Sequence, residues 1–370
     1  MSPIRVGFVG LSASGWASIA HAGPLLKTGA YTIAAVSTSN PLSASASSEK
    51  YSSEEKKVKA YSGDTGAISN DPDVDLVAVS VKTPDHRAAV MPAIAAGKDV
   101  FVEWPLGRNF VETKEIAEAA RRAGVRSMIG LQGWQSPVVK LAREWITAGK
   151  IGRVLSASWI GSKPAEQPYY SPYTVAGGEY TVDPSNGSPT FLSVFIGHNL
   201  SVITRILGPL ASVSASSARM FNTVDFLSTD GKPYGNTAPN VVPDNYSFSG
   251  PLRDHDGALF SGIWRHGIPN DAGRPTLIFL IDGDKGYIKI ESCDLSANVV
   301  HVVSPSKIVL NGEEHKIEDQ MFGNIQRNWE AFAKGESGTW PTFDDAVDVY
   351  KHLDAIERSS EEGRRIDVGV

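Results

Sequence analysis

The chain has 370 residues, of which 41% are hydrophobic and 21% are charged, as in ordinary globular proteins. A chain of this length usually forms more than one hydrophobic core, so we expect two domains. The net charge of -6 means that there is no excess of basic residues to neutralise nucleic-acid phosphates, which argues against direct nucleic-acid binding. No signal-peptide pattern and no membrane-length apolar segment are found, so we expect a cytoplasmic protein, or a nucleocytoplasmic one if it is regulatory, without a membrane partner.

The single cysteine, Cys293, excludes intramolecular disulfides and cysteine-based metal clusters, and we expect no metal site. It lies in a strand-like segment, where a buried structural thiol is the favoured interpretation.

The first third of the chain has the pattern of a parallel α/β domain. Helical spacing occurs at residues 85–96 and 111–123, and Gly97 and Gly124 follow where helix C-caps belong. Five short β-branched runs surround these helices: IRVGFVG, YTIAAVS, VDLVAVSV, KDVFVEW and RSMIGLQ. Because helix-length segments separate the runs, we predict a Rossmann-type dinucleotide-binding domain over residues 1–130.

The remaining chain, residues 131–370, has a different pattern. Ser136 and Pro137 are typical of a helix N-cap and first turn, and this helix should stop at Gly149. Six strand-like segments follow, at residues 154–160, 213–220, 246–249, 258–264, 276–282 and 286–291, and helical segments lie near 321–333 and 343–358. We predict an α+β domain built on a largely antiparallel sheet, with the ligand cleft between the two domains.

A glycine motif directly follows the first strand. Residues 10–15 have the G-x-G-x-x-G spacing, with Ser12 in place of the middle glycine. In this position the amides of a helix N-terminus face a pyrophosphate, although the Ser12 side chain crowds that approach. A tight turn without a ligand is the alternative. The predicted contacts are Gly10, Ser12, Ala13, Ser14, Gly15 and Trp16.

The end of the second strand indicates which dinucleotide is bound. Ser37, Thr38 and Ser39 stand where an NAD enzyme normally has an acidic residue for the ribose hydroxyls. Because no carboxylate repels a 2′-phosphate there, we expect NADP(H) in preference to NAD(H). No arginine strengthens this preference, and equal use of both cofactors is the main alternative.

Two further strings carry a family resemblance. Residues 80–86 read SVKTPDH, and residues 95–106 read AAGKDVFVEWPL. They resemble the T-P-x-x-x-H turn and the A-G-K-H-V-x-x-E-K-P signature of the glucose-fructose oxidoreductase, inositol dehydrogenase and MocA family. The resemblance implies that four residues lie around the nicotinamide half of the cofactor: Thr83, Pro84, His86 and Glu103. Val81, Trp104 and Gln132 are further predicted cofactor contacts.

Within that family the chain is most similar to the fungal branch that contains galactose-pathway repressors. The likeness spans nearly the whole chain and includes Trp16 with His21, residues 101–104 (FVEW), residues 131–133 (LQG) and residues 242–244 (VPD). We expect a homo-oligomer, such as a dimer, formed through the C-terminal sheet. A protein partner is expected if the chain is regulatory.

The departures from the family concern proton transfer. Family dehydrogenases use the lysine of E-K-P with an Asp and a His to take a proton from a substrate hydroxyl. Here Trp104 replaces the lysine, Val194 replaces the Asp, and His198 is kept. A positioned acid or base contributes about 10² to 10⁴-fold, so these losses argue against sugar-alcohol oxidation by the usual route.

The predicted proton donors are His198 and Tyr180, a tyrosine of a Pro/Gly-rich loop. Together with Trp104, Trp134 and Tyr173 they form the predicted substrate site, whose aromatic walls suit a planar or apolar ligand. The alternative for His198 is a core histidine that packs behind the sheet with its hydrogen bonds satisfied. The alternative for the aromatic side chains is that they contribute only to packing.

These residues lead to one main hypothesis and two alternatives. The main hypothesis is an NADPH-dependent reductase of a small organic substrate with a C=N, C=C or C=O bond. An iminium needs no lysine to accept hydride, which fits the loss of the family lysine. The first alternative is a catalytically silent NAD(P)-binding regulatory protein. The second is a nonredox isomerase or cyclase that uses the cleft as a shaped pocket.

Overall fold

The computed structural model describes residues 2–165, 167, 169, 171–175, 178, 181, 184–187, 189–228, 231–269 and 273–369. The chain divides into two compact units. Unit 1 comprises Met1–Gln132 and Phe322–Asp348, and unit 2 comprises Gly133–Met321 and Val349–Val370. The second division falls within helix α9 (Phe343–Glu362).

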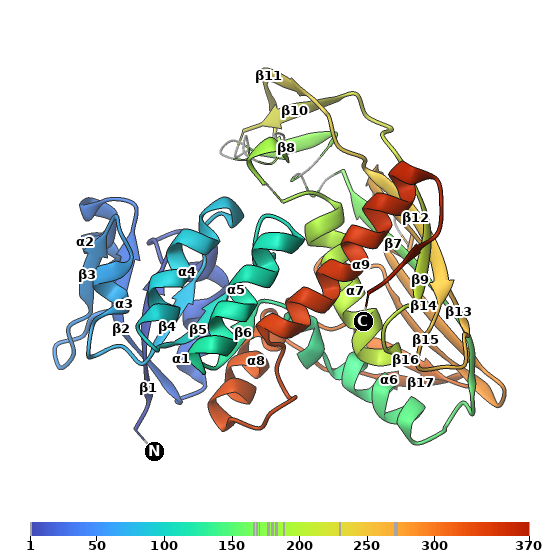
Figure 1. Ribbon diagram of the computed structural model, residues 1–370, viewed down its shortest axis with the longest axis horizontal. Coiled ribbons are helices and arrows are strands. Elements are labelled where there is room, and N and C mark those ends of the chain that lie inside the picture. Colours follow the sequence, from blue (N-terminus) through green and yellow to red (C-terminus); the bar gives the residue numbers. More distant parts are fainter. Residues whose placement is uncertain are drawn as a thin grey trace. The chain divides into compact units, whose positions relative to one another are not determined.

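A six-stranded parallel sheet forms the centre of unit 1, in the order β3-β2-β1-β4-β5-β6 (Figure 1). This is the strand order of a Rossmann fold, and it confirms the predicted fold class. The strands are β1 (Ile4–Val9), β2 (Tyr31–Thr38), β3 (Lys59–Ser62), β4 (Leu76–Val79), β5 (Asp99–Val102) and β6 (Ser127–Ile129). Every residue of β4 is buried, as expected for a central strand covered on both faces.

Helices connect these strands. They are the π-helix η1 (Ala17–His21), α1 (Ala22–Lys27), α2 (Pro41–Tyr51), α3 (Gly66–Ser69), the 3-10 helix η2 (Thr83–Asp85), α4 (His86–Ala95) and α5 (Phe110–Ala123). The Asn109 side chain caps α5 by accepting from the Glu112 amide at 3.0 Å, and Gly124 ends it with φ 68°. The Ser-rich stretch after β2 forms α2, capped in the same way by Asn40.

Unit 1 also includes α8 (Gly323–Lys334), although this helix follows unit 2 along the chain. It lies beside α1 (Figure 1). The reason is a buried aromatic cluster around Trp329, whose ring centroid lies 4.8 Å from that of Phe101 and 5.4 Å from that of Tyr31. The Tyr31 hydroxyl also donates to the Trp329 carbonyl at 2.7 Å.

A nine-stranded sheet forms the core of unit 2, in the order β17-β16-β15-β14-β7-β13-β12-β9-β18. All its neighbouring strands pair antiparallel except β7 with β13. The strands are β7 (Val154–Pro164), β9 (Ser212–Ala218), β12 (Asn245–Pro251), β13 (Leu259–Ile268), β14 (Leu277–Gly283), β15 (Gly286–Ser292), β16 (Lys307–Leu310), β17 (Glu313–Lys316) and β18 (Ile366–Asp367). The prediction of a largely antiparallel sheet is confirmed.

The inner face of this sheet packs against helix α7. Alternate residues of each strand point inward, as the period of two requires, and they include Trp159, Phe248 and Trp264. The Phe248 and Trp264 rings stack at 4.4 Å, and Trp264 Nε1 donates to Asn199 Oδ1 of α7 at 2.9 Å. The remaining described elements of unit 2 are α6 (Pro137–Thr147), η5 (Pro184–Asn186), η6 (Leu192–Ile196), α7 (Gly197–Leu207), and a three-stranded sheet of β8 (Tyr173–Val175), β10 (Thr223–Leu227) and β11 (Pro233–Pro239). The short 3-10 helix η3 (Gln132–Gln135) spans the division between the two units.

Two local expectations are wrong. Cys293 is exposed, because β15 ends at Ser292 and the cysteine begins the following turn. Ser136 does occupy the N-cap position of α6, but its side chain does not cap the helix. Its hydroxyl is instead bonded to that of Ser304, in a buried pair.

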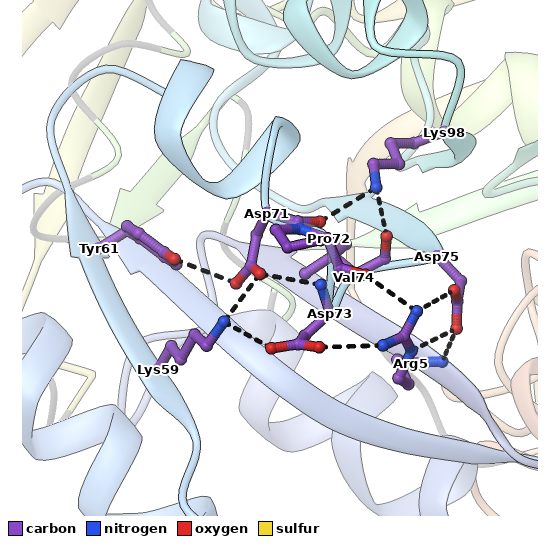
Figure 2. A network of polar contacts seen from close by, with 9 residues as sticks. All are labelled: Arg5, Lys59, Tyr61, Asp71, Pro72, Asp73, Val74, Asp75 and Lys98. Atoms are coloured by element: carbon purple, nitrogen blue, oxygen red, sulfur yellow. Dashed lines mark hydrogen bonds and ion pairs between the residues drawn. The ribbon is translucent and has the colours of Figure 1, made fainter.

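A network of ionic contacts joins the amino ends of the unit 1 strands (Figure 2). Arg5 of β1 contacts Asp73 and Asp75, and Lys59 of β3 contacts Asp71 and Asp73, all from the turn that precedes β4. This edge lies opposite the carboxyl ends of the strands, where parallel sheets bind ligands. Among the described residues, no helix is long and apolar enough to cross a membrane.

Candidate functional site

The predicted cofactor residues follow the carboxyl ends of the unit 1 strands. Gly10 follows β1, Ser39 follows β2, Val81 follows β4 by two residues, Glu103 follows β5, and Gln132 lies shortly after β6. The strand order reverses between β1 and β4, and doubly wound folds bind dinucleotides in the crevice at such a reversal.

The glycine loop has a backbone that only its glycines allow. Gly10 has φ 90°, and a Cβ atom there would lie 2.1 Å from the carbonyl oxygen of Ser80. A Cβ atom on Gly15 would lie 2.6 Å from Ser12 Oγ. The Ser12 side chain therefore occupies the space that Gly15 leaves open, which explains how a serine is accommodated at the middle position of the motif.

The loop also exposes hydrogen-bond donors. Ala13 and Ser14 are exposed and Gly15 is half-buried. Within the described part of the chain, the amides of these three residues donate to no other residue. Adjacent backbone amides at a helix start bind phosphate oxygens, so the loop fits a pyrophosphate.

A lysine that the sequence reasoning missed lies beside this loop. Lys50 Nζ, from α2, donates to the Ala13 carbonyl at 2.7 Å and to Ser18 Oγ at 2.6 Å. Ser18 Oγ is also 2.7 Å from the Tyr51 hydroxyl. Lys50 thus holds the loop and brings a positive charge to it. The hydrophilic face of α2 gave no sign that one of its residues would reach the glycine loop.

The three residues at the end of β2 differ in exposure. Ser37 is buried, and its carbonyl accepts from the Gly10 amide at 2.8 Å. Thr38 is also buried, and its hydroxyl donates to the Asn40 carbonyl at 3.1 Å. Ser39 is exposed, so it is the residue of this run whose hydroxyl faces solvent.

Glu103 is the centre of a hydrogen-bond cluster. Its Oε1 accepts from Trp16 Nε1 at 2.8 Å and from His21 Nε2, and its Oε2 accepts from Gln132 Nε2 at 3.4 Å. A Cβ atom on Gly130 would lie 2.3 Å from Glu103 Oε2, so the glycine makes room for the carboxylate. Trp16 itself is 45% exposed at the loop. The carboxylate therefore joins the glycine loop to the ends of β5 and β6.

His86 is fully buried and joins two turns of the same edge. Its Nδ1 lies 2.8 Å from the Pro105 carbonyl oxygen, and its Nε2 lies 3.1 Å from that of Val81. Burial lowers the pKa of His86, while these carbonyl contacts and the Glu103 charge act in the opposite direction. Thr83 and Trp104 are likewise buried, whereas Val81 and Pro84 are half-buried.

Gln132 contributes one acceptor with no partner. Its side-chain amide is buried, and Oε1 is not hydrogen-bonded to any described residue. A buried amide oxygen without a donor is unfavourable by about 1 to 3 kcal/mol, so it favours a ligand that brings an N–H group. A nicotinamide carboxamide is such a ligand.

Unit 2 holds the predicted proton donor. His198 lies in the first turn of α7 and is 7% exposed. The ring centroid of His301 lies 4.7 Å from that of His198, a neighbour that the sequence did not indicate. Val194, at the family's Asp position, lies in η6 directly before α7.

The predicted aromatic residues of unit 2 have separate environments. Trp134 Nε1 donates to the Ser201 carbonyl at 3.2 Å, and the Arg205 guanidinium lies 4.1 Å above its ring, a cation–π contact. Tyr173 lies half-buried in β8. Tyr180 lies outside the described residues.

Two family models match the chain over these units. Residues 4–131 match the oxidoreductase family with an NAD-binding Rossmann fold, and residues 137–292 match the C-terminal domain of Gal80p. These matches show a Rossmann domain of the Gfo/Idh/MocA type followed by a Gal80-like C-terminal domain. The Rossmann match supports a nicotinamide dinucleotide as the cofactor.

Individual relatives fall into two functional groups. The dehydrogenase aclE of Aspergillus oryzae is 29% identical, with 98% of this chain and 97% of the relative covered. The galactose/lactose metabolism regulatory protein GAL80 of Saccharomyces cerevisiae is 28% identical, with 78% and 67% covered. The solved structure of the transcriptional regulator Gal80p from Kluyveromyces lactis has a TM-score of 0.85 and 26% identity, with 99% and 91% covered.

Proposed function

We propose that this protein is an NADPH-dependent reductase of a small organic molecule that contains a C=O, C=N or C=C bond. The observation that carries the proposal is the glycine loop, whose exposed amides at residues 13–15 fit a pyrophosphate at the carboxyl edge of the sheet. The buried acceptor of Gln132 supports a nicotinamide in the same unit. When bound, the reduced dinucleotide supplies hydride.

The preference for NADPH rests on charge and on hydroxyl groups. No acidic side chain follows β2, and the exposed Ser39 offers a hydroxyl to a 2′-phosphate. Lys50 adds a positive charge beside the loop, which favours the more negatively charged dinucleotide.

In this proposal the residues of each unit have distinct roles. Glu103 fixes the indole of Trp16 at the loop, and His86 fixes the turns that carry Val81, Thr83, Pro84 and Trp104. His198 gives a proton to the reduced substrate. The apolar walls of the substrate site are formed by Trp104, Trp134 and Tyr173. Tyr180 is a second proton donor.

Calorimetry with NADPH and NADH tests the cofactor site. The wild-type protein should bind at least one of them, with NADPH favoured. Gly15→Asp should abolish binding, because the new carboxylate repels the pyrophosphate and its Cβ displaces the Ser12 side chain. Gly23→Asp is the matched control, since Gly23 is exposed in α1 and a Cβ there meets no atom within 4 Å. An absence of heat with both dinucleotides would refute the proposal.

A regulatory function is the second candidate, and the match of residues 137–292 to the Gal80p C-terminal domain favours it. In that case the protein binds the dinucleotide without turnover and presents a surface to a protein partner. Stable NADPH binding without oxidation, across carbonyl, imine and enone substrates, would support this candidate over the reductase.

We also propose a cytoplasmic homodimer formed through the outer face of the nine-stranded sheet. Ile160 of β7 is paired with Ile263 of β13 and Ile278 of β14, so three half-buried isoleucines form a row on that face. Light scattering should give a dimer for the wild-type protein and a monomer for Ile263→Asp. A wild-type monomer would exclude this part of the proposal.

A further inference from the structure

The carboxyl-terminal half of helix α2 lies against the glycine loop. Lys50 and Tyr51 follow Ser47 by three and four residues, so the three side chains share one face of the helix. The buried Ser47 hydroxyl donates to the Leu11 carbonyl, and the two later residues reach the next part of the loop. All of these contacts lie within unit 1.

The Ala13 carbonyl is the common acceptor of this cluster. Lys50 Nζ donates to it at 2.7 Å, and Ser18 Oγ donates to it at 3.2 Å. A carbonyl oxygen has two lone pairs, so these two donors complete its hydrogen bonding. The carbonyl is therefore held in one direction by an ammonium group and a hydroxyl.

The directions of the other hydrogen bonds follow from this arrangement. Lys50 Nζ also donates to Ser18 Oγ at 2.6 Å, since an ammonium group has no acceptor. The one proton of Ser18 Oγ is directed to the Ala13 carbonyl, so the Tyr51 hydroxyl must donate to Ser18 Oγ, 2.7 Å away. Each donor of the cluster thus acts on the Ala13 carbonyl, directly or through Ser18, and such chains strengthen one another.

This carbonyl belongs to the same peptide group as the Ser14 N–H. In a planar trans peptide the C=O and N–H bonds point in opposite directions. Because the Ala13 carbonyl points toward α2, the Ser14 N–H points away from it. Ser14 is exposed, and its amide donates to no other described residue. A charged donor on the carbonyl also polarises the peptide group and makes its N–H a stronger donor.

We propose that Lys50 is a positioning residue for the dinucleotide, because it fixes the Ala13–Ser14 peptide group with its N–H toward the pyrophosphate. Without this contact an exposed loop peptide can rotate and present its carbonyl oxygen, which repels phosphate oxygens. A peptide group that is already oriented lowers the ordering cost of binding. The inference rests on the cofactor site of the proposed function and adds to it a residue that acts through the loop.

Calorimetry with ADP-ribose tests the diphosphate contact apart from the nicotinamide. Lys50→Met should weaken the binding of ADP-ribose, NADH and NADPH by about tenfold or more, as expected when a charged hydrogen bond is lost. Lys50→Arg should restore most of the affinity, because its guanidinium can donate to the same carbonyl. The matched control is Lys57→Met, at an exposed lysine of the same unit, which should bind like the wild type.

Two results of this calorimetry would overturn the proposal. The first is an unchanged affinity for all three ligands in Lys50→Met. The second is a loss confined to NADPH, because ADP-ribose and NADH share the diphosphate but lack the 2′-phosphate. That result would assign Lys50 to the 2′-phosphate instead of the loop.

Ser18→Ala separates orientation from charge. It removes one donor to the Ala13 carbonyl and leaves the net charge unchanged. It should weaken ADP-ribose binding, and its effect should be non-additive with that of Lys50→Met, because both substitutions act on one peptide group. If Ser18→Ala binds like the wild type and the effect of Lys50→Met vanishes at high salt, the lysine acts by charge alone and the proposal fails.

The peptide group itself can be observed without a ligand. In protein labelled with ¹³C-carbonyl alanine and ¹⁵N serine, triple-resonance NMR detects only the peptide groups that join an alanine to a following serine. The Ala13–Ser14 signal, assigned by its absence in Ser14→Ala, should shift in Lys50→Met and stay in place in Lys57→Met. An unchanged signal in Lys50→Met would show that the lysine does not hold this peptide group.

The outcomes separate this inference from the proposed function. If the wild-type protein binds ADP-ribose and dinucleotides, and Lys50→Met binds them equally well, only the role of Lys50 fails. If Lys50→Met loses affinity but the wild-type protein never oxidises NADPH with any substrate, the role of Lys50 stands and the reductase function fails. If the wild-type protein binds neither ADP-ribose nor a dinucleotide, both fail.

Discussion

The Glu103 carboxylate accepts a hydrogen bond from the His21 ring, although 82 residues separate them in sequence. His21 is fully buried, and its Nδ1 accepts from Trp329 Nε1 at 3.2 Å. The ring proton must therefore be on Nε2, which donates to Glu103. A chain of hydrogen bonds thus runs from α8 through His21 to the carboxyl end of β5, where the cofactor is proposed to bind.

Replacement of Glu103 should destabilise unit 1. Glu103→Ala leaves the ring nitrogens of Trp16 and His21 and the amide of Gln132 without their acceptor, for an expected loss of about 1 to 3 kcal/mol in the free energy of unfolding. Glu103→Gln, which keeps an acceptor oxygen, should lose less. Urea unfolding measures both.

A surface glutamate provides the control for this substitution. Glu115 pairs with Arg87 on exposed helix faces, so Glu115→Ala should leave stability nearly unchanged. If Glu103→Ala were as stable as Glu115→Ala, the cluster would not contribute to the fold.

The sequence predicted those features whose cause is local. Strand runs of unit 1 and the glycine loop follow from period, spacing and turn chemistry within a few residues, and the structure has them in the expected positions. The Glu103 cluster was not predictable in this way, because Trp16, His21, Gln132 and Trp329 come together only through the tertiary fold. The return of α8 to unit 1 is similar, since its amphipathic pattern does not specify which partner it meets.

A local pattern led to a wrong prediction where strand β15 ends one residue earlier than expected. Cys293 was expected to be buried because the preceding residues alternate like a strand, yet the strand stops at Ser292.

Cofactor preference should depend on the exposed end of β2. Ser39→Asp places a carboxylate where a 2′-phosphate is proposed to bind, so it should weaken NADPH binding more than NADH binding. Ser37 is unsuitable for this test, because it is buried and an aspartate there would disturb the sheet. Calorimetry with both dinucleotides measures the two affinities.

Ser45→Asp is the control for charge alone, since Ser45 is exposed within α2. It should change both affinities little. An equal loss of NADPH and NADH affinity in Ser39→Asp would show that residue 39 does not contact the 2′ position.

The ionic network at the amino ends of the strands should make unit 1 sensitive to acid. Burial raises the pKa of Asp71, but hydrogen bonds from Lys59, the Asp73 amide and Tyr61 together hold it below its usual value. Its contribution to stability is therefore complete above the unfolded-state pKa of about 3.9 and is lost as pH falls through the lower folded-state pKa.

Asp71→Asn should remove about 1 to 2 kcal/mol of stability at neutral pH and flatten the loss of stability in acid. Thermal unfolding as a function of pH measures both effects. Asp73→Asn, at a more exposed carboxylate of the same turn, should have the smaller effect. A steeper acid dependence in Asp71→Asn than in the wild type would contradict the assigned role of Asp71.

Removal of the His198 ring tests its proposed role in proton transfer. His198→Ala should lower turnover by about 10² or more, because a positioned acid is lost. NADPH affinity should change little, since the glycine loop belongs to unit 1 and His198 to unit 2. His255→Ala, in the turn between β12 and β13, is the control and should retain full activity. If NADPH is bound but never oxidised, and His198→Ala alters only the binding of a protein partner, the histidine is part of a regulatory surface and the reductase proposal fails.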